Sequence, residues 1–159
     1  ILQKEINILD SDDAVSLELK LRDLGAGLLL KAVPLIKSKD YKLTSQDESR
    51  VTLAGKLKKS DGLIDWSKPA QEIINLIRGT VPWPSAFTHY KGKFLKIFKA
   101  RAVDSPRAGS SAGEVLSAAK EGIAVATGQG ALLIQELQIE GKRRMKVEEF
   151  IAGHKIVVA

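Results

Sequence analysis

Hydrophobic and polar positions along the chain follow two periods, one strand-like and one helical. Residues 1–9 alternate apolar and polar side chains, which predicts a half-buried strand. Beyond the turn and capping residues 10–12, leucines at steps of four, three and four residues predict a helix: Leu17, Leu21, Leu24 and Leu28. Pro34 is expected to break this helix and leave a short helical piece after it.

A linker and a second helix follow. Residues 37–60 are polar and lack a sustained period, which predicts a linker that runs over the surface. The second helix is expected to begin after Ser67, its N-cap, and to bury three isoleucines at helical spacing: Ile73, Ile74 and Ile77. The run Pro82-Trp83-Pro84 cannot continue a helix, so it predicts an extended exit.

The residues from Ser85 onward have the pattern of an all-β unit with glycine-containing turns. Five strands are predicted, at 94–103, 113–118, 123–127, 132–139 and 155–158. The segments 120–122 and 128–130 have the composition of hairpin turns, and residues 147–153 are expected to form one short helix. Five strands with one small helix are typical of an OB-like β-barrel.

Composition narrows the classes of function. The 159 residues are 44% hydrophobic and 28% charged, as in ordinary globular domains, and no apolar run approaches the roughly 20 residues that cross a bilayer. We therefore expect no membrane partner. Because the chain has no cysteine and two histidines, disulfides and thiol nucleophiles are excluded, and a structural zinc site has too few of its usual ligands.

The net charge of +6 is unevenly distributed. Residues 1–50 carry eight lysines and arginines against nine acidic residues, whereas residues 86–159 carry twelve against seven. A basic second half after a neutral first third indicates a polyanionic partner for the second half. The alternative is an ordinary basic face in contact with solvent.

Several residues that could be catalytic have simpler structural explanations. The segment 128–130 leads into a strand rather than a helix, which favours a hairpin over a phosphate loop. His89 has no acidic or nucleophilic partner in the sequence and is expected to be a loop histidine. Asp61 and Asp65 suit turns, and Trp66 and Trp83 suit packing. No catalytic, cofactor-binding or metal-binding residue is predicted.

Basic residues in two clusters, together with one arginine between them, are the candidate binding residues. Long cationic side chains in loops can reach phosphate oxygens without groove-specific geometry. The candidates are Lys56, Lys58 and Lys59 in the linker, Arg78 at the end of the second helix, and Lys142, Arg143 and Arg144 in the loop after Gly141.

Three stretches of the chain carry a resemblance to a known family. The string IDWSKPAQEIINLIRGTVPWPSAFT at 64–88 is similar to the start of the C-terminal domain of methionyl-tRNA formyltransferases. Residues 12–26 resemble that family's "DT..SL..KL..LGA" helix, and residues 137–145 resemble its "LQ..GKK.M" loop. Several motifs in the right order make the resemblance specific.

The resemblance implies a domain organisation and a division of labour. Residues 1–36 would be the strand and helix that end an α/β catalytic domain, residues 37–60 a basic linker, and residues 61–159 the tRNA-binding OB-like domain. The family's catalytic Asn, His and Asp and its "HGSLLP" loop are absent from this sequence, so the chain alone is expected to be inactive. The family's complete enzyme transfers formyl from 10-formyltetrahydrofolate to methionyl-initiator-tRNA, so the implied partners are that tRNA and an N-terminal catalytic domain. A cytoplasmic monomer, or an organellar one in a eukaryote, is expected.

The sequence also predicts a mode of binding and leaves alternatives open. Between Lys99 and Glu149 the chain has no Phe, Tyr or Trp, so the barrel is expected to lack a base-stacking platform. Backbone and shape recognition of a folded RNA is the expected mode. The alternatives are the C-terminal domain of a folate-dependent formyl hydrolase or a sugar-nucleotide formyltransferase, or a free-standing RNA-binding module without an enzymatic parent.

Overall fold

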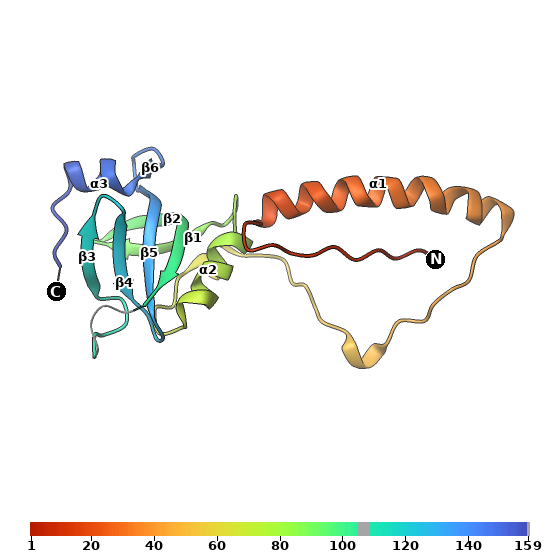
Figure 1. The fold of residues 1–159 in the computed structure, drawn as a ribbon, viewed down its shortest axis with the longest axis horizontal. Coiled ribbons are helices and arrows are strands. Elements are labelled where there is room, and N and C mark those ends of the chain that lie inside the picture. The colour runs from red at the N-terminus through yellow and green to blue at the C-terminus, as the bar shows by residue number, and fades with distance from the viewer. Residues whose placement is uncertain (105–108, 159) are drawn as a thin grey trace. The chain divides into compact units, whose positions relative to one another are not determined.

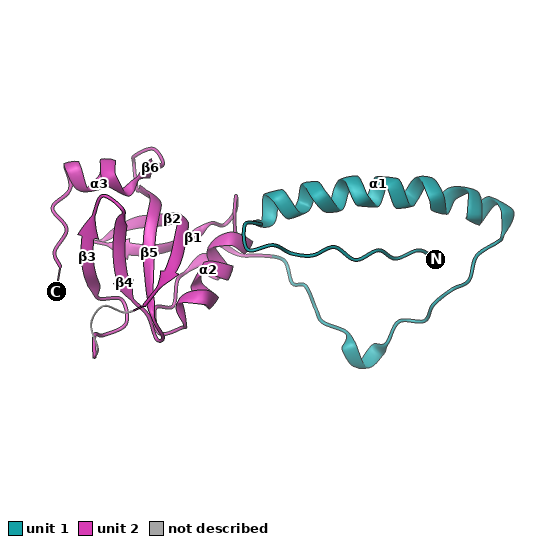
Figure 2. Cartoon of the chain, viewed as in Figure 1, with its two compact units in different colours: residues 1–56 teal, residues 57–159 magenta. Residues whose placement is uncertain are grey.

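The chain divides into two units. The computed structural model describes residues 1–104 and 109–158. Residues 1–56 form the N-terminal unit and residues 57–159 the C-terminal unit, coloured separately in Figure 2. The assignment of residues 1–36 to a catalytic domain and of residues 37–60 to a linker stays a prediction.

The N-terminal unit contains one long helix, α1 (Ala14–Ser38). Asp13 caps it, because its Oδ1 accepts a hydrogen bond from the Ser16 amide at 2.8 Å. The predicted break at Pro34 is wrong, since α1 continues past this proline to Ser38. Pro34 removes one backbone donor, but the end of the helix keeps its capping bonds, from the Lys39 amide to the Ile36 carbonyl at 3.2 Å and from the Asp40 amide to the Leu35 carbonyl at 3.1 Å. Lys39 ends the helix in the left-handed conformation with φ of 57°.

The predicted strand at the N-terminus is also wrong. Residues 1–9, all described, have no regular secondary structure, and the β-pairing in the described residues lies within the C-terminal unit. A strand needs a neighbouring strand to satisfy its backbone groups, so an alternating pattern without such a neighbour does not form one. Within the linker residues, the structure has a short 3-10 helix, η1 (Glu48–Arg50).

A curled antiparallel sheet forms the C-terminal unit, as Figure 1 shows. Its strand order is β1-β2-β5-β4-β3, and β6 pairs with β5. The strands are β1 (Ala86–Tyr90), β2 (Lys93–Val103), β3 (Val115–Ala119), β4 (Gly122–Ala126), β5 (Ala131–Ile139) and β6 (Met145–Lys146). The predicted mainly-β, OB-like fold is thereby confirmed, including the hairpins at 120–122 and 128–130.

Two predictions about the ends of the sheet need correction. The strand β1 was missed, because Thr88 and His89 interrupt its apolar pattern. The predicted closing strand at 155–158 is irregular in the structure. Side-chain contacts hold this segment instead: the Tyr90 hydroxyl donates to the Lys155 carbonyl at 3.3 Å.

Two helices close the core of the C-terminal unit. Helix α2 (Ala70–Gly79) buries Ile73, Ile74 and Ile77 as predicted and packs mainly against β2. Helix α3 (Val147–Gly153) covers the β3–β4–β5 side of the sheet with Val147 and Phe150, both 1% exposed. The core between them includes Ile97, Leu132 and Leu137, each 0% exposed.

Residues 61–69, here termed the strap, cross the sheet before α2. Ile64 donates to the Phe87 carbonyl at 2.8 Å, and Ala70 donates to the Gln129 carbonyl at 3.1 Å. The predicted N-cap role of Ser67 is wrong: Pro69 occupies that position, and the Ser67 hydroxyl donates to Asp65 Oδ1 at 2.6 Å. Trp66 packs against the core, whereas Trp83 is 56% exposed and lies outside it.

Candidate nucleic-acid interface

Strand β2 presents two chemically different faces. Leu95 and Ile97 point into the core and are 6% and 0% exposed. Phe94, Lys96 and Phe98 alternate with them and therefore lie on the opposite face. We call this surface, together with the cations that pack on it, the β2 outer face.

The neighbouring strand β1 extends this face. His89 pairs with Phe94, and Phe87 pairs with Lys96. The His89 ring lies 4.7 Å from the Phe94 ring, and the Phe87 ring lies 5.2 Å from it. His89 is an exposed residue of a regular strand, so its prediction as a loop histidine is wrong.

Lys59 is held over an aromatic ring of this face. Its ammonium lies 4.8 Å from the centroid of Phe94, which is a cation–π distance. The 3-10 helix η2 (Lys59–Gly62) begins at this lysine, and Asp61 Oδ2 accepts from the Lys58 amide at 2.8 Å. Lys59 lies two residues before the strap. The strap residue Leu63 pairs with Phe87 of β1, and this pairing holds Lys59 on the outer side of the sheet.

Arg144 occupies an equivalent position at the other aromatic ring. Its guanidinium carbon lies 4.6 Å from the centroid of Phe98, and its Nε donates to Glu136 Oε2 at 2.9 Å. Phe98 sits at a register shift between Ile97 and Lys99, where the ladder with β5 is irregular. Arg144 directly precedes β6, whose pairing with β5 places it beside Glu136.

The other two cations of the loop differ in their pairing. Arg143 forms an ion pair with Glu149 of α3. Lys142 is exposed, and within residues 1–104 and 109–158 its ammonium has no ion-pair partner. Two carboxylates therefore offset much of the positive charge of the two arginines, and Lys142 contributes its full charge.

The remaining predicted site residues lie elsewhere. Lys58 is exposed next to Lys59, and Arg78 is half-buried in the last turn of α2. Lys56 is an exposed residue of the N-terminal unit. Of the seven predicted residues, the structure thus brings Lys59 and Arg144 onto one face.

Sequence reasoning missed the aromatic part of this face. The expectation of a barrel without outward aromatics considered only residues 99–149, and Phe94 and Phe98 lie before that range. The signal was present in the alternation of Lys93-Phe-Leu-Lys-Ile-Phe-Lys99, in which every second residue after Phe94 faces outward. Lys96 belongs to the same set.

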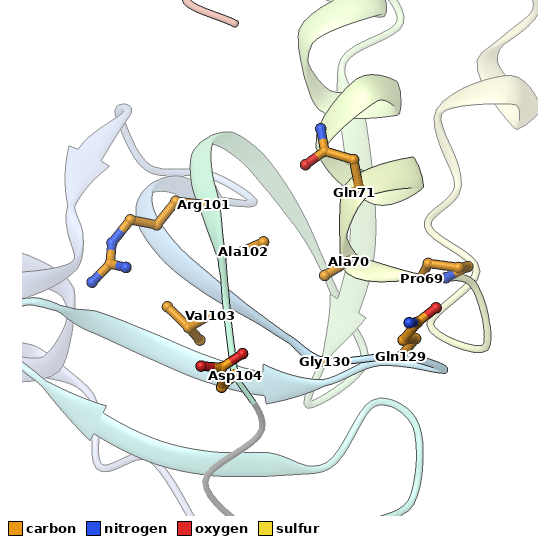
Figure 3. A pocket seen from close by; sticks show the side chains of 9 residues that line it. All are labelled: Pro69, Ala70, Gln71, Arg101, Ala102, Val103, Asp104, Gln129 and Gly130. Atoms are coloured by element: carbon orange, nitrogen blue, oxygen red, sulfur yellow. The ribbon is translucent and has the colours of Figure 1, made fainter.

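A hollow of about 850 Å³ lies at the start of α2 and the end of β2. Its lining, drawn in Figure 3, comprises Pro69, Ala70, Gln71, Arg101, Ala102, Val103, Asp104, Gln129 and Gly130. The Arg101 guanidinium extends away from α2 in this view, so its charge does not face Gln71. Among the described residues no group of three His, Asp or Glu side chains is placed to hold a metal ion, and no helix there is long and apolar enough to span a bilayer.

The curled six-stranded sheet with α2 and α3 against it defines a small OB-like β-barrel domain. The chain belongs to the family "Formyl transferase, C-terminal domain", which matches residues 56–155. It is 40% identical over 156 residues to the methionyl-tRNA formyltransferase of Acetivibrio thermocellus. The aligned region covers 98% of this chain and 50% of that protein. It is 43% identical over 157 residues to that of Desulfotalea psychrophila, with 98% and 48% covered. The chain spans about half the length of these relatives.

Solved structures support the fold. HypX from Aquifex aeolicus, in a variant with four substitutions, superimposes with a TM-score of 0.66 at 18% identity, covering 94% of this chain and 27% of HypX. HypX in complex with tetrahydrofolic acid gives a TM-score of 0.55 at 20% identity, covering 79% of this chain and 22% of HypX. At this identity the likeness concerns the fold alone.

Proposed function

We propose that this chain is the tRNA-binding part of a methionyl-tRNA formyltransferase. In its complete form the enzyme would transfer a formyl group from 10-formyltetrahydrofolate to the amino group of methionyl-initiator-tRNA. The observation that carries the proposal is 40% identity to the Acetivibrio thermocellus enzyme over 98% of the chain. Formyl hydrolases and sugar-nucleotide formyltransferases, the alternatives, have no comparable need for a polycationic surface.

The charge of the C-terminal unit supports a polyanionic ligand. Lys58, Lys59 and Lys142 are exposed, and Lys96 lies on the same outer face as Lys59. Such cations bind phosphate oxygens and release the counterions condensed on RNA. Lys56, Arg78, Arg143 and Arg144 complete the proposed set of binding residues.

The chain's contribution to catalysis would be positioning. By holding the tRNA, it would place the methionyl amine near a formyl donor bound by a separate N-terminal domain, which lowers the barrier without any proton transfer by this chain. No donor-binding or catalytic residue is proposed here, so the 159 residues alone are expected to be inactive. We propose that the protein acts as a monomer in the cytoplasm.

Charge reversal at unpaired lysines tests the proposal. The variant K58E/K59E/K142E removes no ion pair of the described residues, and it is compared with K4E/K31E/K37E, which changes the net charge equally but in the N-terminal unit. Binding to fluorescently labelled initiator tRNA is measured by anisotropy at fixed salt. We expect the first variant to bind at least roughly tenfold more weakly and the second to bind nearly as well as the unaltered chain.

Two results would contradict the proposal. If the unaltered chain does not bind the tRNA, the assignment to a tRNA-binding role is wrong. If both triple variants lose affinity equally, binding depends on net charge alone and the proposed residues are not its site.

A further inference from the structure

Two cations of the β2 outer face share an unusual environment. Lys59 and Arg144 come from segments far apart in the sequence, yet each packs on a phenylalanine of one strand, at 4.8 Å and 4.6 Å from the ring centroids. The rings belong to Phe94 and Phe98, four residues apart on β2, which is about 13 Å along a strand. One phosphate group cannot bridge that distance.

We propose that Phe94 and Phe98 are positioning residues that hold Lys59 and Arg144 as two fixed contacts for successive stretches of one ribose-phosphate backbone. This inference rests on the proposed function and deepens it by naming how the cations are fixed. Long cationic side chains lose rotamer entropy when they bind phosphate, and a cation that already rests on an aromatic ring has lost part of it beforehand.

The geometry of Arg144 shows how this positioning would work. Its Nε and Nη2 both face Glu136 Oε2, and its guanidinium carbon lies over Phe98. Within the described residues Nη1 has no hydrogen-bond acceptor, and the side chain is 53% exposed. The ring and the carboxylate thus fix the guanidinium plane while one edge stays available to a phosphate oxygen.

Phe94 and Lys59 form the simpler half of the arrangement. Lys59 has no carboxylate partner among the described residues, so the ring alone restrains its ammonium. His89 and Phe87 pack against the same ring and fix its orientation. An ammonium on a ring keeps its remaining N–H groups free for phosphate.

A double-mutant cycle on the 159-residue chain tests the inference. The variants are F98L, R144A and F98L/R144A, and leucine keeps an apolar side chain of moderate size while it removes the ring. Initiator tRNA affinity is measured at several salt concentrations. We expect F98L and R144A each to weaken binding by roughly three- to tenfold and the double variant to be no weaker than R144A. R144A should also reduce the slope of log K against log salt by about 0.7 to 0.9, and F98L should reduce it in the same direction.

The slope of log K against log salt distinguishes a loss of Arg144 positioning from a loss of barrel stability. A leucine that only loosened the barrel would lower the midpoint of unfolding, followed by tryptophan fluorescence, without changing the salt slope. F150L is the matched control, because Phe150 is buried in the core of the same unit and no cation packs on its ring in the described residues; it should lower the midpoint of unfolding and leave the salt slope unchanged.

The outcomes distinguish the two proposals. If the unaltered chain does not bind tRNA, the proposed function and this inference both fail. If it binds and R144A is weaker while F98L is not, only the positioning role of Phe98 is overturned. Additive losses in F98L and R144A would overturn it as well, because the ring would then act independently of the arginine.

Discussion

The indole Nε1 of Trp66 donates a hydrogen bond to Thr88 Oγ1 at 3.1 Å. The two residues are 22 positions apart, and their contact fastens the strap to β1. Since Lys59 lies two residues before the strap, in the 3-10 helix that leads into it, the position of this proposed contact residue depends on how firmly the strap is held.

Replacing Thr88 by valine should therefore destabilise the C-terminal unit. T88V keeps the shape of the side chain but leaves the indole N–H without its acceptor, which is expected to cost about 1 kcal/mol or more. T88S keeps the hydroxyl and should cost less. Urea unfolding followed by tryptophan fluorescence reports on this unit, because Trp66 and Trp83 both belong to it. Equal midpoints for T88V and the unaltered chain would show that the hydrogen bond does not hold the strap.

A second prediction concerns Gly128, where the β4–β5 hairpin touches the strap. Its amide donates to the Trp66 and Lys68 carbonyls at 2.9 and 3.0 Å. A Cβ at this position would lie 1.8 Å from the Ser67 carbonyl oxygen, so G128A must displace backbone and is expected to lose about 2 to 3 kcal/mol. In G79A the added methyl meets nothing within 4 Å, and stability should stay the same or rise by less than about 1 kcal/mol. A G128A variant as stable as G79A would contradict the observed packing.

The stability of the start of α1 should depend on pH because of the Asp12 carboxyl. The hydrogen bond from Lys20, at 2.6 Å, together with that from the Leu9 amide, lowers the pKa of this carboxyl from 3.8 to about 2. Because the folded pKa is lower than the unfolded one, the stabilisation is fully present above pH 3.8 and is lost as the pH falls through about 2.

The Leu9 amide resonance provides the measurement for Asp12. In an NMR titration it should shift with a midpoint near pH 2 in the unaltered chain. K20M should raise the midpoint, whereas K31M, further along α1, should leave it unchanged. A midpoint near 3.8 in the unaltered chain would show that the carboxylate is not held by Lys20.

Hydrogen exchange should differ sharply between the two units of this chain. Strand β5 contains Leu132 and Leu137, which are fully buried, whereas every residue of α1 is at least partly exposed. Amides of β5 should therefore exchange most slowly and those of α1 much faster. Protection of α1 equal to that of β5 would mean that its leucines are covered in solution.

Elements with a strong local pattern were predictable from the sequence. The long run of strand-favouring residues from Phe94 to Val103 predicted β2, and the isoleucine spacing predicted the buried face of α2. The strand expected at 1–9 failed because pairing depends on distant segments, which a local pattern does not contain. Pro34 was given too much weight, since α1 contains it and continues for one more turn to Ser38.

The candidate site was predictable only as a set of charges. Lys59 and Arg144 could be named from their clusters, but their placement on Phe94 and Phe98 depends on the strap and on the β5–β6 pairing. Likewise, the partners of Arg143 and Arg144 are carboxylates on α3 and β5, which lie close only in the folded chain. Contacts between segments far apart in the sequence therefore decide both where these cations lie and which carboxylates they pair with.

We propose that a cationic face of the barrel binds the backbone of a folded RNA. The most direct test is the affinity of the 159-residue chain for initiator tRNA between about 50 and 300 mM salt. Each phosphate contact contributes a slope of about −0.7 to −0.9, so contacts by Lys58, Lys59, Lys142 and Arg144 alone predict a straight line with a slope of about −3, and further contacts by the other proposed residues would make it steeper. An affinity that stays constant across this range would show that these cations do not bind the RNA backbone.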